Sequence, residues 1–309
     1  MTQYAYFEGA IRPIAEAKIS IMNQTFNYGT GCFGGIRGYW NEDQKQLYVF
    51  RLRDHYRRFL NSSRLLLGNL DFTPDQLAQI TVDLLAQEGW QENVYIRPLY
   101  YKADELIGVR LHNLRDAVAI FSLPMGRYLA AEEGLKVCTS SWRRVDDTAI
   151  PPRGKLIGSY VNSALIKSEA VLNGFDEAIV LNQDGHIAEA SAANLVMIRH
   201  GKFVTPPATA NSLEGITLNS LMHLARHELG LEVVERQIDR TEIYFADEAF
   251  FCGTGAQIAA IASVDHRQIG SGVMGPITAR LRDLFFRVVR GQEADYMHWL
   301  TPVHQPIPA

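Results

Sequence analysis

Two consecutive β-hairpin patterns in the second half of the chain constrain its fold more than any other feature. Residues 177–191 (EAIVLN-QDG-HIAEAS) turn at Asp184-Gly185, and residues 194–207 (NLVMIR-HG-KFVTPP) turn at His200-Gly201. Both pairs are turn-prone, and the arms on either side are typical of strands. Strands that follow one another through tight turns pair antiparallel, which argues against a doubly wound parallel sheet.

Helical and strand-like segments alternate irregularly along the rest of the chain. Apolar residues at helical spacing predict helices, and short alternating or continuous apolar runs predict strands. Helices are expected at 51–67, 73–89, 156–172, 217–229 and 276–290, and strands at 5–12, 47–50, 93–101, 116–124, 135–142, 231–237 and 248–252. This mixture predicts the α+β class.

The length of the chain, 309 residues, exceeds what one core usually serves, so two domains are expected. Hydrophobic residues make up 47% and charged residues 21%, which is typical of globular domains. The composition changes around residues 125–134, just before a strand-like segment. We therefore expect a domain over 1–126, a linker over 127–134 and a second domain over 135–309.

The charge balance favours a small-molecule partner. Lysine and arginine number 30 and the acidic residues 34, giving a net charge of −4 and no broad basic surface for nucleic acid or an anionic membrane. Cys32, Cys138 and Cys252 lie far apart and form neither a zinc pattern nor a disulfide scaffold, so no metal is expected. Without a secretory pattern or a membrane-length apolar run, a cytoplasmic protein is expected.

Lys155 is the most distinctive of the seven lysines, most of which we expect on the surface. Rigid Pro151-Pro152 precedes it, small Gly158-Ser159 follows it, and the surrounding segment is apolar. Burial lowers the pKa of an amine and favours Schiff-base chemistry. A solvent-exposed lysine at the start of a helix explains the same pattern, so spacing alone leaves both interpretations open.

Other segments could bind anions or carboxylates. Residues 215–217 open a predicted helix whose first N–H groups are free, and residues 253–255 (Gly-Thr-Gly) follow a strand. Tyr95 and Arg97 share one face of a strand and could together line a carboxylate pocket, although an edge-strand ion pair fits equally well. Glu189 in its apolar hairpin needs a cation or a ring nitrogen unless it faces water.

The order of these segments resembles a known family. YGTGCFGGIRGY, RLRDHYRRFLNSS, YIRPL, Lys155 with Tyr160, IAEASAANL, LEGIT and CGTG follow one another over nearly the whole chain. They resemble the fold-type IV aminotransferases, which use pyridoxal phosphate, and are most similar to the branched-chain amino acid aminotransferases. The resemblance implies a smaller N-terminal α/β domain and a larger C-terminal mixed α/β domain with a pseudo-barrel sheet.

The resemblance also implies roles for individual residues. Lys155 would form the Schiff base with the cofactor, Glu189 would meet its ring nitrogen and Tyr160 its ring hydroxyl. The phosphate would be held by Arg58, Ile216, Thr217, Gly253 and Thr254. The substrate would contact Tyr28, Phe33, Arg37, Tyr95, Arg97, Tyr128, Thr254 and Gly255.

These roles imply transamination. The amino group of leucine, isoleucine or valine would pass to the cofactor and then to 2-oxoglutarate, with Lys155 moving the proton between substrate and cofactor. Arg97 or Arg37 would meet the second carboxylate of glutamate. A homodimer or higher homo-oligomer is expected, because the segments 28–37 and 102–115 are suited to covering a neighbour's pocket.

Several positions depart from the family pattern. Gly34 stands where Glu is common, Ala192 and Ala193 replace a Gly-Glu pair, and Met125 lies where a Trp-Gly-Ala pattern is frequent. D-amino acid aminotransferase, (R)-amine transaminase and aminodeoxychorismate lyase therefore remain alternatives with the same fold. A cofactor-free Schiff-base aldolase and a non-enzymatic binding module remain alternatives of a different class.

Overall fold

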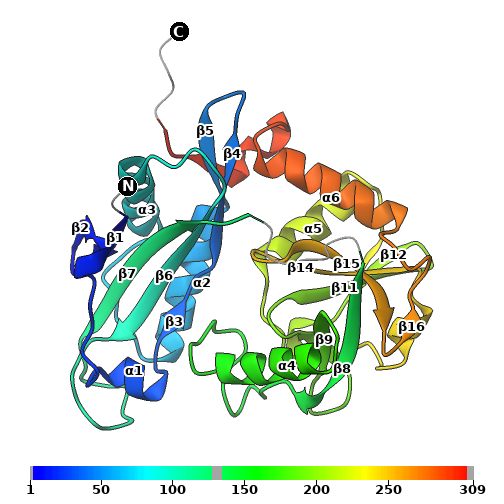
Figure 1. The fold of residues 1–309 in the computed structure, drawn as a ribbon, viewed down its shortest axis with the longest axis horizontal. Helices are drawn as coiled ribbons and strands as arrows, with labels where there is room; N and C mark the ends of the chain where they lie inside the picture. The colour runs from blue at the N-terminus through cyan, green and yellow to red at the C-terminus, as the bar shows by residue number, and fades with distance from the viewer. Residues whose placement is uncertain (1–2, 127–133, 305–309) are drawn as a thin grey trace. The chain divides into compact units, whose positions relative to one another are not determined.

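Most helices and strands of the computed structural model begin and end where local sequence signals place them (Figure 1). The structure describes residues 3–126 and 134–304. The predicted linker falls almost wholly on residues 127–133 and lies, with Tyr128, outside the described residues. The mixture of helices and largely antiparallel sheet confirms the predicted α+β class.

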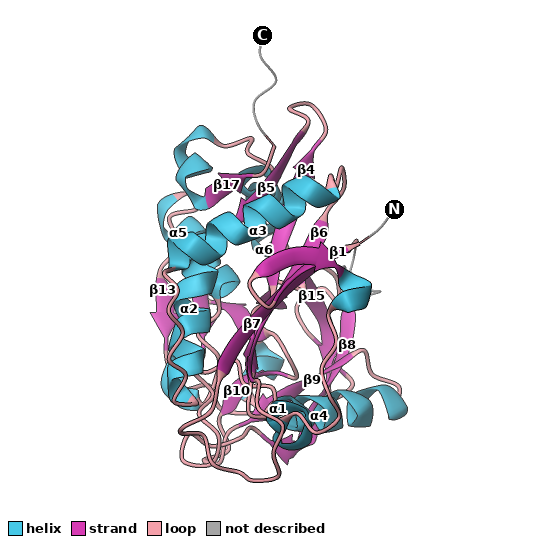
Figure 2. Cartoon of the chain, turned by 90° about the vertical axis from the view of Figure 1, so that its left-hand side faces the viewer, coloured by secondary structure: helices cyan, strands magenta, loops and turns pink. Residues whose placement is uncertain are grey.

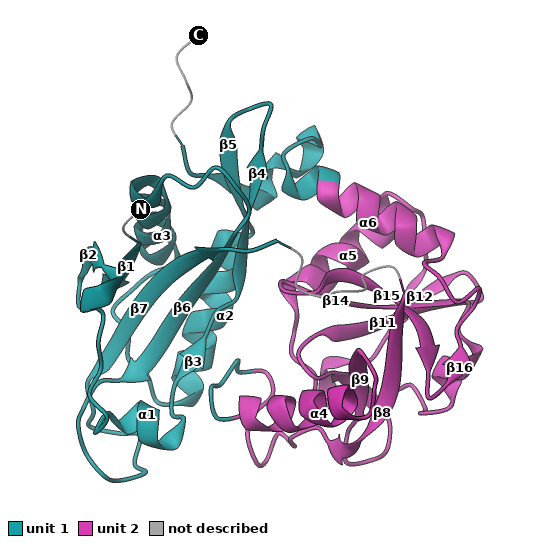
Figure 3. Ribbon diagram, viewed as in Figure 1, with its two compact units in different colours: residues 1–126, 154–158, 287–309 teal, residues 127–153, 159–286 magenta. Residues whose placement is uncertain are grey.

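The chain forms two compact units (Figure 3). Unit 1 contains residues 1–126, 154–158 and 287–309, and unit 2 contains residues 127–153 and 159–286. Residues 154–158 and 287–309 therefore belong with the N-terminal part of the chain, although they follow it far along the sequence. This places Lys155 in unit 1 and Glu189 in unit 2.

Unit 1 is built on an antiparallel sheet in the order β17-β5-β4-β6-β7-β1-β2, with β3 paired to β6. Its strands are β1 (Tyr4–Phe7), β2 (Ala10–Pro13), β3 (Cys32–Phe33), β4 (Ile36–Asn41), β5 (Gln46–Phe50), β6 (Val94–Lys102), β7 (Asp116–Pro124) and β17 (Leu300–Pro302). Its helices include α1 (Gln24–Tyr28), α2 (Leu52–Leu65) and α3 (Pro74–Glu88).

The two long helices of unit 1 cover its sheet (Figure 2). Helix α3 begins with a capping box, in which Thr73 accepts from the Gln76 N–H, and it ends at Gly89 in the left-handed conformation. Helix α2 buries Leu52, Tyr56 and Phe59 along one face. Helix α3 packs on β1 and β7, and α2 packs on α3 and β3.

Unit 2 contains a nine-stranded sheet in the order β10-β9-β8-β15-β14-β11-β12-β13, with β16 paired to β15. Its strands are β8 (Leu135–Arg143), β9 (Glu177–Leu181), β10 (Ile187–Ala190), β11 (Asn194–Arg199), β12 (Lys202–Thr205), β13 (Val233–Glu235), β14 (Glu248–Gly253), β15 (Gln257–Val264) and β16 (Arg267–Gln268). Helices α4 (Tyr160–Leu172), α5 (Ile216–His227) and α6 (Pro276–Val289) accompany it.

Both predicted hairpins are confirmed. Strands β9 and β10 pair antiparallel around Asp184-Gly185, and β11 and β12 pair antiparallel around His200-Gly201. Strand β8 instead runs parallel to its neighbours β9 and β15. The core of this sheet consists of buried aliphatic and aromatic side chains, among them Leu195, Phe251 and Ile261.

The structure differs from the expected local structure in several places. The helix predicted straight after Lys155 begins only at Tyr160. Ile157 and Gly158 instead donate backbone hydrogen bonds to the carbonyls of Gly31 and Gly29, and residues 157–159 form a turn. Strand β15 was missed, because its alanine-rich sequence is a weak strand signal. Lys102 is 1% exposed and pairs with Asp116 at 2.8 Å instead of facing solvent.

Candidate active site

Lys155 lies on an extended segment whose backbone is held on both sides. Its N–H donates to Ser62 Oγ at 3.2 Å, and its carbonyl accepts from the Phe33 N–H at 3.0 Å. The neighbouring Leu156 forms an antiparallel bridge with Cys32. The half-buried side chain places Nζ 5.1 Å from the centroid of the Phe33 ring. The lysine is therefore not a solvent-exposed residue at a helix start.

Helix α2 presents Arg58 and His55 on one face, three residues apart. Arg58 is half-buried, whereas its neighbour Arg57 is exposed and pairs with Asp54 at 2.7 Å. The imidazole of His55 is 3% exposed. Burial, with the nearby charges of Arg58, Arg51 and Lys155, lowers its pKa well below the usual 6.5. This part of unit 1 is positively charged and suits an anion.

Phe33 lies between two cationic groups. The Arg97 guanidinium carbon is 4.3 Å from the Phe33 ring centroid, and Lys155 Nζ is 5.1 Å from it. Arg97 also donates to the hydroxyl oxygen of Tyr95 from Nη2 at 2.8 Å and from Nε at 3.2 Å. The predicted pairing of Tyr95 and Arg97 on one strand face is therefore present. Together these side chains combine an aromatic surface with a half-buried guanidinium.

The remaining predicted substrate residues of unit 1 differ in accessibility. Arg37 is 2% exposed and donates to the carbonyl of Met125 at 2.8 Å and to that of Gly126. Tyr28 ends α1 and is 36% exposed. A Cβ at Gly34 would lie 2.5 Å from Pro98 Cγ, so this backbone conformation has no room for the glutamate common in the family.

The predicted segment 28–37 is less exposed than a covering loop would be. From Gly31 to Arg37 its residues are buried within unit 1, because they form β3 and the start of β4. Only its first residue, Tyr28, stands with exposed neighbours on α1. The glycine-rich pattern predicted a loop, but its glycines allow close backbone packing instead.

Glu189 in unit 2 is buried and has a cationic partner that the sequence did not reveal. Its Oε1 lies 2.7 Å from Arg144 Nη2, and both residues are less than 10% exposed. Glu189 Oε2 accepts from Asn194 Nδ2 and from the Leu213 N–H, each at 3.2 Å. The carboxylate is therefore held in one orientation within its hairpin and does not face water.

Asn194 contacts several of the segments of unit 2 that were predicted to contribute to the site. Its amide donates to Glu189 and to the Leu213 carbonyl at 2.9 Å, and its backbone pairs with Cys252 in the β11–β14 ladder. A Cβ at Gly215 would overlap the Asn194 side-chain oxygen, so only glycine fits there. The carboxylate, the start of α5 and the end of β14 are thus brought together within unit 2.

Two backbone elements of unit 2 match the predicted anion cradles. Helix α5 begins at Ile216, and its N-cap Gly215 has no side chain to cap the first amides. These N–H groups and the helix dipole favour an anion. The Thr254-Gly255 turn connects β14 to β15 and is partly exposed. Tyr160 begins α4 and is half-buried.

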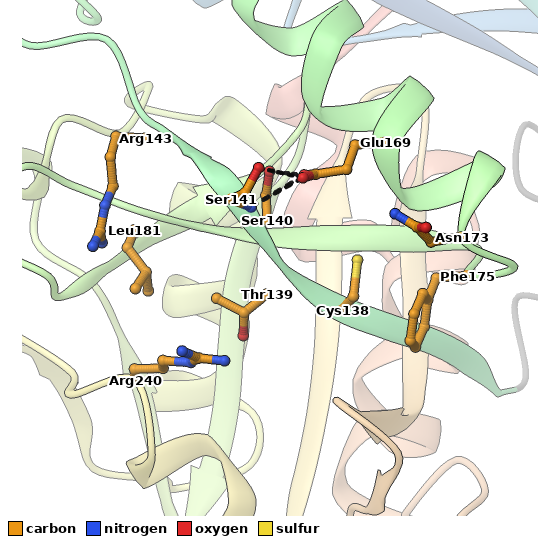
Figure 4. Close-up of a pocket in the computed structure, with 10 residues that line it drawn as sticks. All are labelled: Cys138, Thr139, Ser140, Ser141, Arg143, Glu169, Asn173, Phe175, Leu181 and Arg240. Carbon is orange, nitrogen blue, oxygen red and sulfur yellow. Dashed lines mark hydrogen bonds between the residues drawn. The ribbon is translucent and has the colours of Figure 1, made fainter.

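A separate cavity of about 350 Å³ opens on unit 2 and contains none of the predicted site residues (Figure 4). Glu169 accepts from Ser140 Oγ at 2.5 Å and from Ser141, and Arg240 pairs with Asp265 at 3.3 Å. Burial raises the pKa of Cys138 in its wall to about 11, so it remains a thiol. These charged groups are satisfied by neighbouring side chains and are not directed at a ligand.

Each unit by itself contains groups of the kind that bind pyridoxal phosphate. Unit 1 supplies a primary amine and a cationic helix face, while unit 2 supplies uncapped helix amides and a buried carboxylate oriented by Arg144 and Asn194. These are the groups that an aldehyde, a phosphate and a ring nitrogen require. Among the described residues, no cluster of His, Cys, Asp and Glu could hold a metal ion.

A fold of this kind, with these residue types, is typical of a pyridoxal-phosphate-dependent enzyme. The family model described as amino-transferase class IV matches residues 31–264. The chain belongs to the class IV aminotransferases, and the predicted enzyme class and cofactor are confirmed. The cofactor-free aldolase and the binding module are thereby excluded.

Known proteins of similar sequence and structure are aminotransferases. A relative from Aquifex aeolicus (strain VF5), named "probable branched-chain-amino-acid aminotransferase", is 46% identical over 301 residues, which is 97% of each chain. The branched-chain amino acid aminotransferase of Thermobaculum terrenum in its PLP form has a TM-score of 0.94 and 41% identity, covering 98% of this chain and 99% of that chain.

A third protein was solved with an amino acid. The branched-chain aminotransferase from the thermophilic archaeon Thermoproteus uzoniensis with norvaline has a TM-score of 0.94 and 38% identity, with 98% of this chain and 100% of that chain covered. These similarities confirm the predicted fold type. Within the described residues, no helix is sufficiently long and apolar to cross a membrane.

Proposed function

We propose that this aminotransferase transfers the amino group of leucine, isoleucine or valine to 2-oxoglutarate, with Lys155 as the amine that binds pyridoxal phosphate. The observation that carries the substrate assignment is the position of Phe33. Its ring lies 4.3 Å from the Arg97 guanidinium carbon and 5.1 Å from Lys155 Nζ. An apolar surface and a cation beside the same amine suit an aliphatic side chain and a γ-carboxylate in turn.

We assign a contact with the cofactor to each of the following residues. Arg58 and the amides near Ile216, Thr217, Gly253 and Thr254 bind the phosphate, because Arg58 is positively charged and a helix start such as that of α5 leaves N–H groups available. Glu189, oriented by Arg144 and Asn194, binds the ring nitrogen, and Tyr160 binds the ring hydroxyl. When bound, pyridoxal phosphate supplies an electron sink for the negative charge that develops at the substrate Cα.

Lys155 moves the proton in this proposal. As a free amine, its Nζ would take the proton from the substrate Cα and deliver it to the cofactor carbon C4′, on the other side of the substrate nitrogen, which a single flexible side chain can do. The backbone bonds to Ser62 and Phe33 hold the main chain still while the side chain rotates. Thr254 and Gly255 offer polar groups for the substrate.

Arg97 is better placed than Arg37 for the γ-carboxylate of glutamate. Arg37 is buried and donates to the Met125 and Gly126 carbonyls, whereas Arg97 is half-buried and donates to one tyrosine hydroxyl. A guanidinium that pairs with a γ-carboxylate matters for glutamate and little for leucine. Comparing glutamate with leucine therefore tests whether Arg97 binds the γ-carboxylate.

The test is single-turnover kinetics of Arg97→Ala with each amino acid separately. Loss of a hydrogen bond to a charged group should raise the barrier for glutamate by about 1.5–3 kcal/mol, while leucine changes much less. Tyr95→Phe is the control, since it removes the hydroxyl to which Arg97 donates and keeps the charged guanidinium. Equal losses for both amino acids would contradict the shared pocket, and Lys155→Ala should abolish turnover with either.

We also propose that unit 1 forms a homo-oligomer interface. Ile21 (81%), Phe26 (67%), Ile107 (75%) and Val109 (74%) are highly exposed apolar residues. They belong together, because Gln24 on α1 donates to the carbonyls of Gly108 and Arg110 in the loop before β7. An apolar surface of this kind is typical of contacts between protein chains.

A further inference from the structure

Ser62 connects two parts of the proposed site through one hydroxyl group. It lies on α2, one turn after Arg58, and is 1% exposed. Its Oγ donates to the Arg58 carbonyl at 2.9 Å and accepts from the Lys155 N–H at 3.2 Å. The second bond joins residues 93 positions apart in the sequence.

Serine is not a favoured residue in the interior of a helix, so the presence of Ser62 in α2 requires an explanation. Its hydroxyl competes with the helix for backbone hydrogen bonds, so serine is neutral or unfavourable in helix interiors. Ser62 follows the usual pattern by donating to the carbonyl four residues earlier, which leaves its lone pairs as acceptors. The Lys155 N–H uses this acceptor in a segment that lies outside any helix.

The position of this link matters for the cofactor. Arg58 is proposed to hold the cofactor's phosphate, and Lys155 its reactive carbon. Both groups are attached to the same ring, so the distance between the two residues must match the distance between the two groups. A displacement of about 1 Å can cost roughly 100-fold in rate. A hydrogen bond from the helix turn that carries Arg58 to the backbone of Lys155 restricts this separation.

We propose that Ser62 is a positioning residue that sets Lys155 relative to the phosphate-binding turn of α2. The inference rests on the proposed function, since it concerns the same lysine. Ser62 does not touch substrate or cofactor in this scheme. It acts through the main chain of Lys155, and its loss should displace Nζ without removing any group that reacts.

The chain contains a matched control at the next position. Ser63 is also 1% exposed, and its Oγ also donates to a carbonyl of the preceding helix turn, that of Leu60 at 2.9 Å. Its side chain has no hydrogen bond to Lys155 among the described residues. Replacing either serine by alanine removes one buried hydroxyl from the same helix, and only one of the two changes affects the lysine.

The experiment compares Ser62→Ala, Ser63→Ala and Ser62→Thr as purified, cofactor-loaded proteins. Urea unfolding measures the structural cost of each change. The pH dependence of the near-visible absorption of the bound cofactor reports the environment of Lys155 Nζ, and single turnover with leucine reports the rate. We expect Ser62→Ala to shift the pH midpoint and to slow single turnover roughly 10- to 100-fold.

The control variants decide the outcome. Ser63→Ala should lose similar stability, keep the wild-type pH midpoint and stay within about twofold in rate, and Ser62→Thr should recover most of the loss because it retains a hydroxyl. Equal effects of the two alanine variants on midpoint and rate would overturn the proposal. A wild-type protein that binds no pyridoxal phosphate would instead contradict the proposed function, whatever the serine variants show.

Discussion

Glu189 forms a buried ion pair with Arg144, and it is also the carboxylate that we propose to bind the ring nitrogen of the cofactor. Their side chains approach to 2.7 Å, and Asn194 adds a further hydrogen bond to the carboxylate. A carboxylate held in this way can bind a protonated ring nitrogen. The guanidinium of Arg144 compensates the negative charge of the buried carboxylate. Substitution must therefore separate an effect on stability from an effect on turnover.

We expect Glu189→Gln to lower both the stability of the protein and its turnover. It leaves the Arg144 charge buried without its partner, which typically costs about 3–5 kcal/mol. The double variant Glu189→Gln/Arg144→Met should regain most of this stability, because an apolar side chain replaces the unpaired charge. Turnover should remain low in both variants, as measured by single-turnover kinetics beside urea unfolding. Wild-type turnover in either would assign Glu189 to the structure alone.

His55 makes the stability of the protein depend on pH in a defined direction. Burial and the charges of Arg58, Arg51 and Lys155 lower its pKa well below 6.5 in the folded state. The unfolded chain takes up this proton near pH 6.5, and the folded protein takes it up only at lower pH. The stability from neutral His55 is therefore complete above pH 6.5 and is lost progressively below it.

Replacing His55 by asparagine should flatten this pH dependence. One proton changes the unfolding free energy by at most about 1.4 kcal/mol per pH unit, so the slope below pH 6.5 should fall by up to that amount. The measurement is urea unfolding at a series of pH values, compared by slope because the substitution also changes packing. The same change at exposed His112 is the control. An unchanged slope in His55→Asn would contradict the argument.

At the level of elements, the start of α5 depends on one side-chain contact. Gly215 caps the helix, and a Cβ at this position would overlap the Asn194 oxygen. Asn194 cannot move freely, because it also bonds Glu189 and the Leu213 carbonyl. The helix N-terminus, the asparagine and the carboxylate are therefore coupled within unit 2.

Gly215→Ala should consequently cost more than another glycine substitution nearby. Forcing extra volume into a packed site typically costs about 1–3 kcal/mol. Gly253→Ala is the comparison, since a Cβ there would lie 3.8 Å from Ala193, an ordinary contact distance. Urea unfolding of both variants should rank Gly215→Ala as clearly less stable. Equal stability would mean that Asn194 relaxes without cost.

At the level of the whole molecule, the exposed apolar surface of unit 1 predicts self-association. Aspartate at Phe26 and Val109 would place charges in an apolar interface, which opposes association. Sedimentation velocity should show an oligomer for the wild type and smaller species for Phe26→Asp/Val109→Asp. Val273→Asp is the control, because it adds an aspartate at an exposed apolar residue of unit 2. A wild-type monomer with full activity at high dilution would exclude the proposal.

Local signals accounted for the elements that the sequence predicted well. Helix α3 has a capping box at Thr73 and a left-handed Gly89 at its end, and the hairpins have Asp184-Gly185 and His200-Gly201 between their arms. These signals act over a few residues and do not need the rest of the protein. Strand β15 lacked such a signal and is formed by pairing with β14 and β8.

For the candidate site, too, some features follow from local sequence and others only from tertiary structure. The sequence by itself determined which residue types are available, namely a distinctive lysine, a carboxylate in an apolar hairpin and free amides at a helix start. Tertiary structure decided their partners: Arg144 for Glu189, and Ser62 for the Lys155 backbone. A hydrogen bond between residues 93 positions apart leaves no local pattern, because both partners keep their own backbone preferences. Only the packing of β3, α2 and the segment after Gly154 brings such groups within bonding distance.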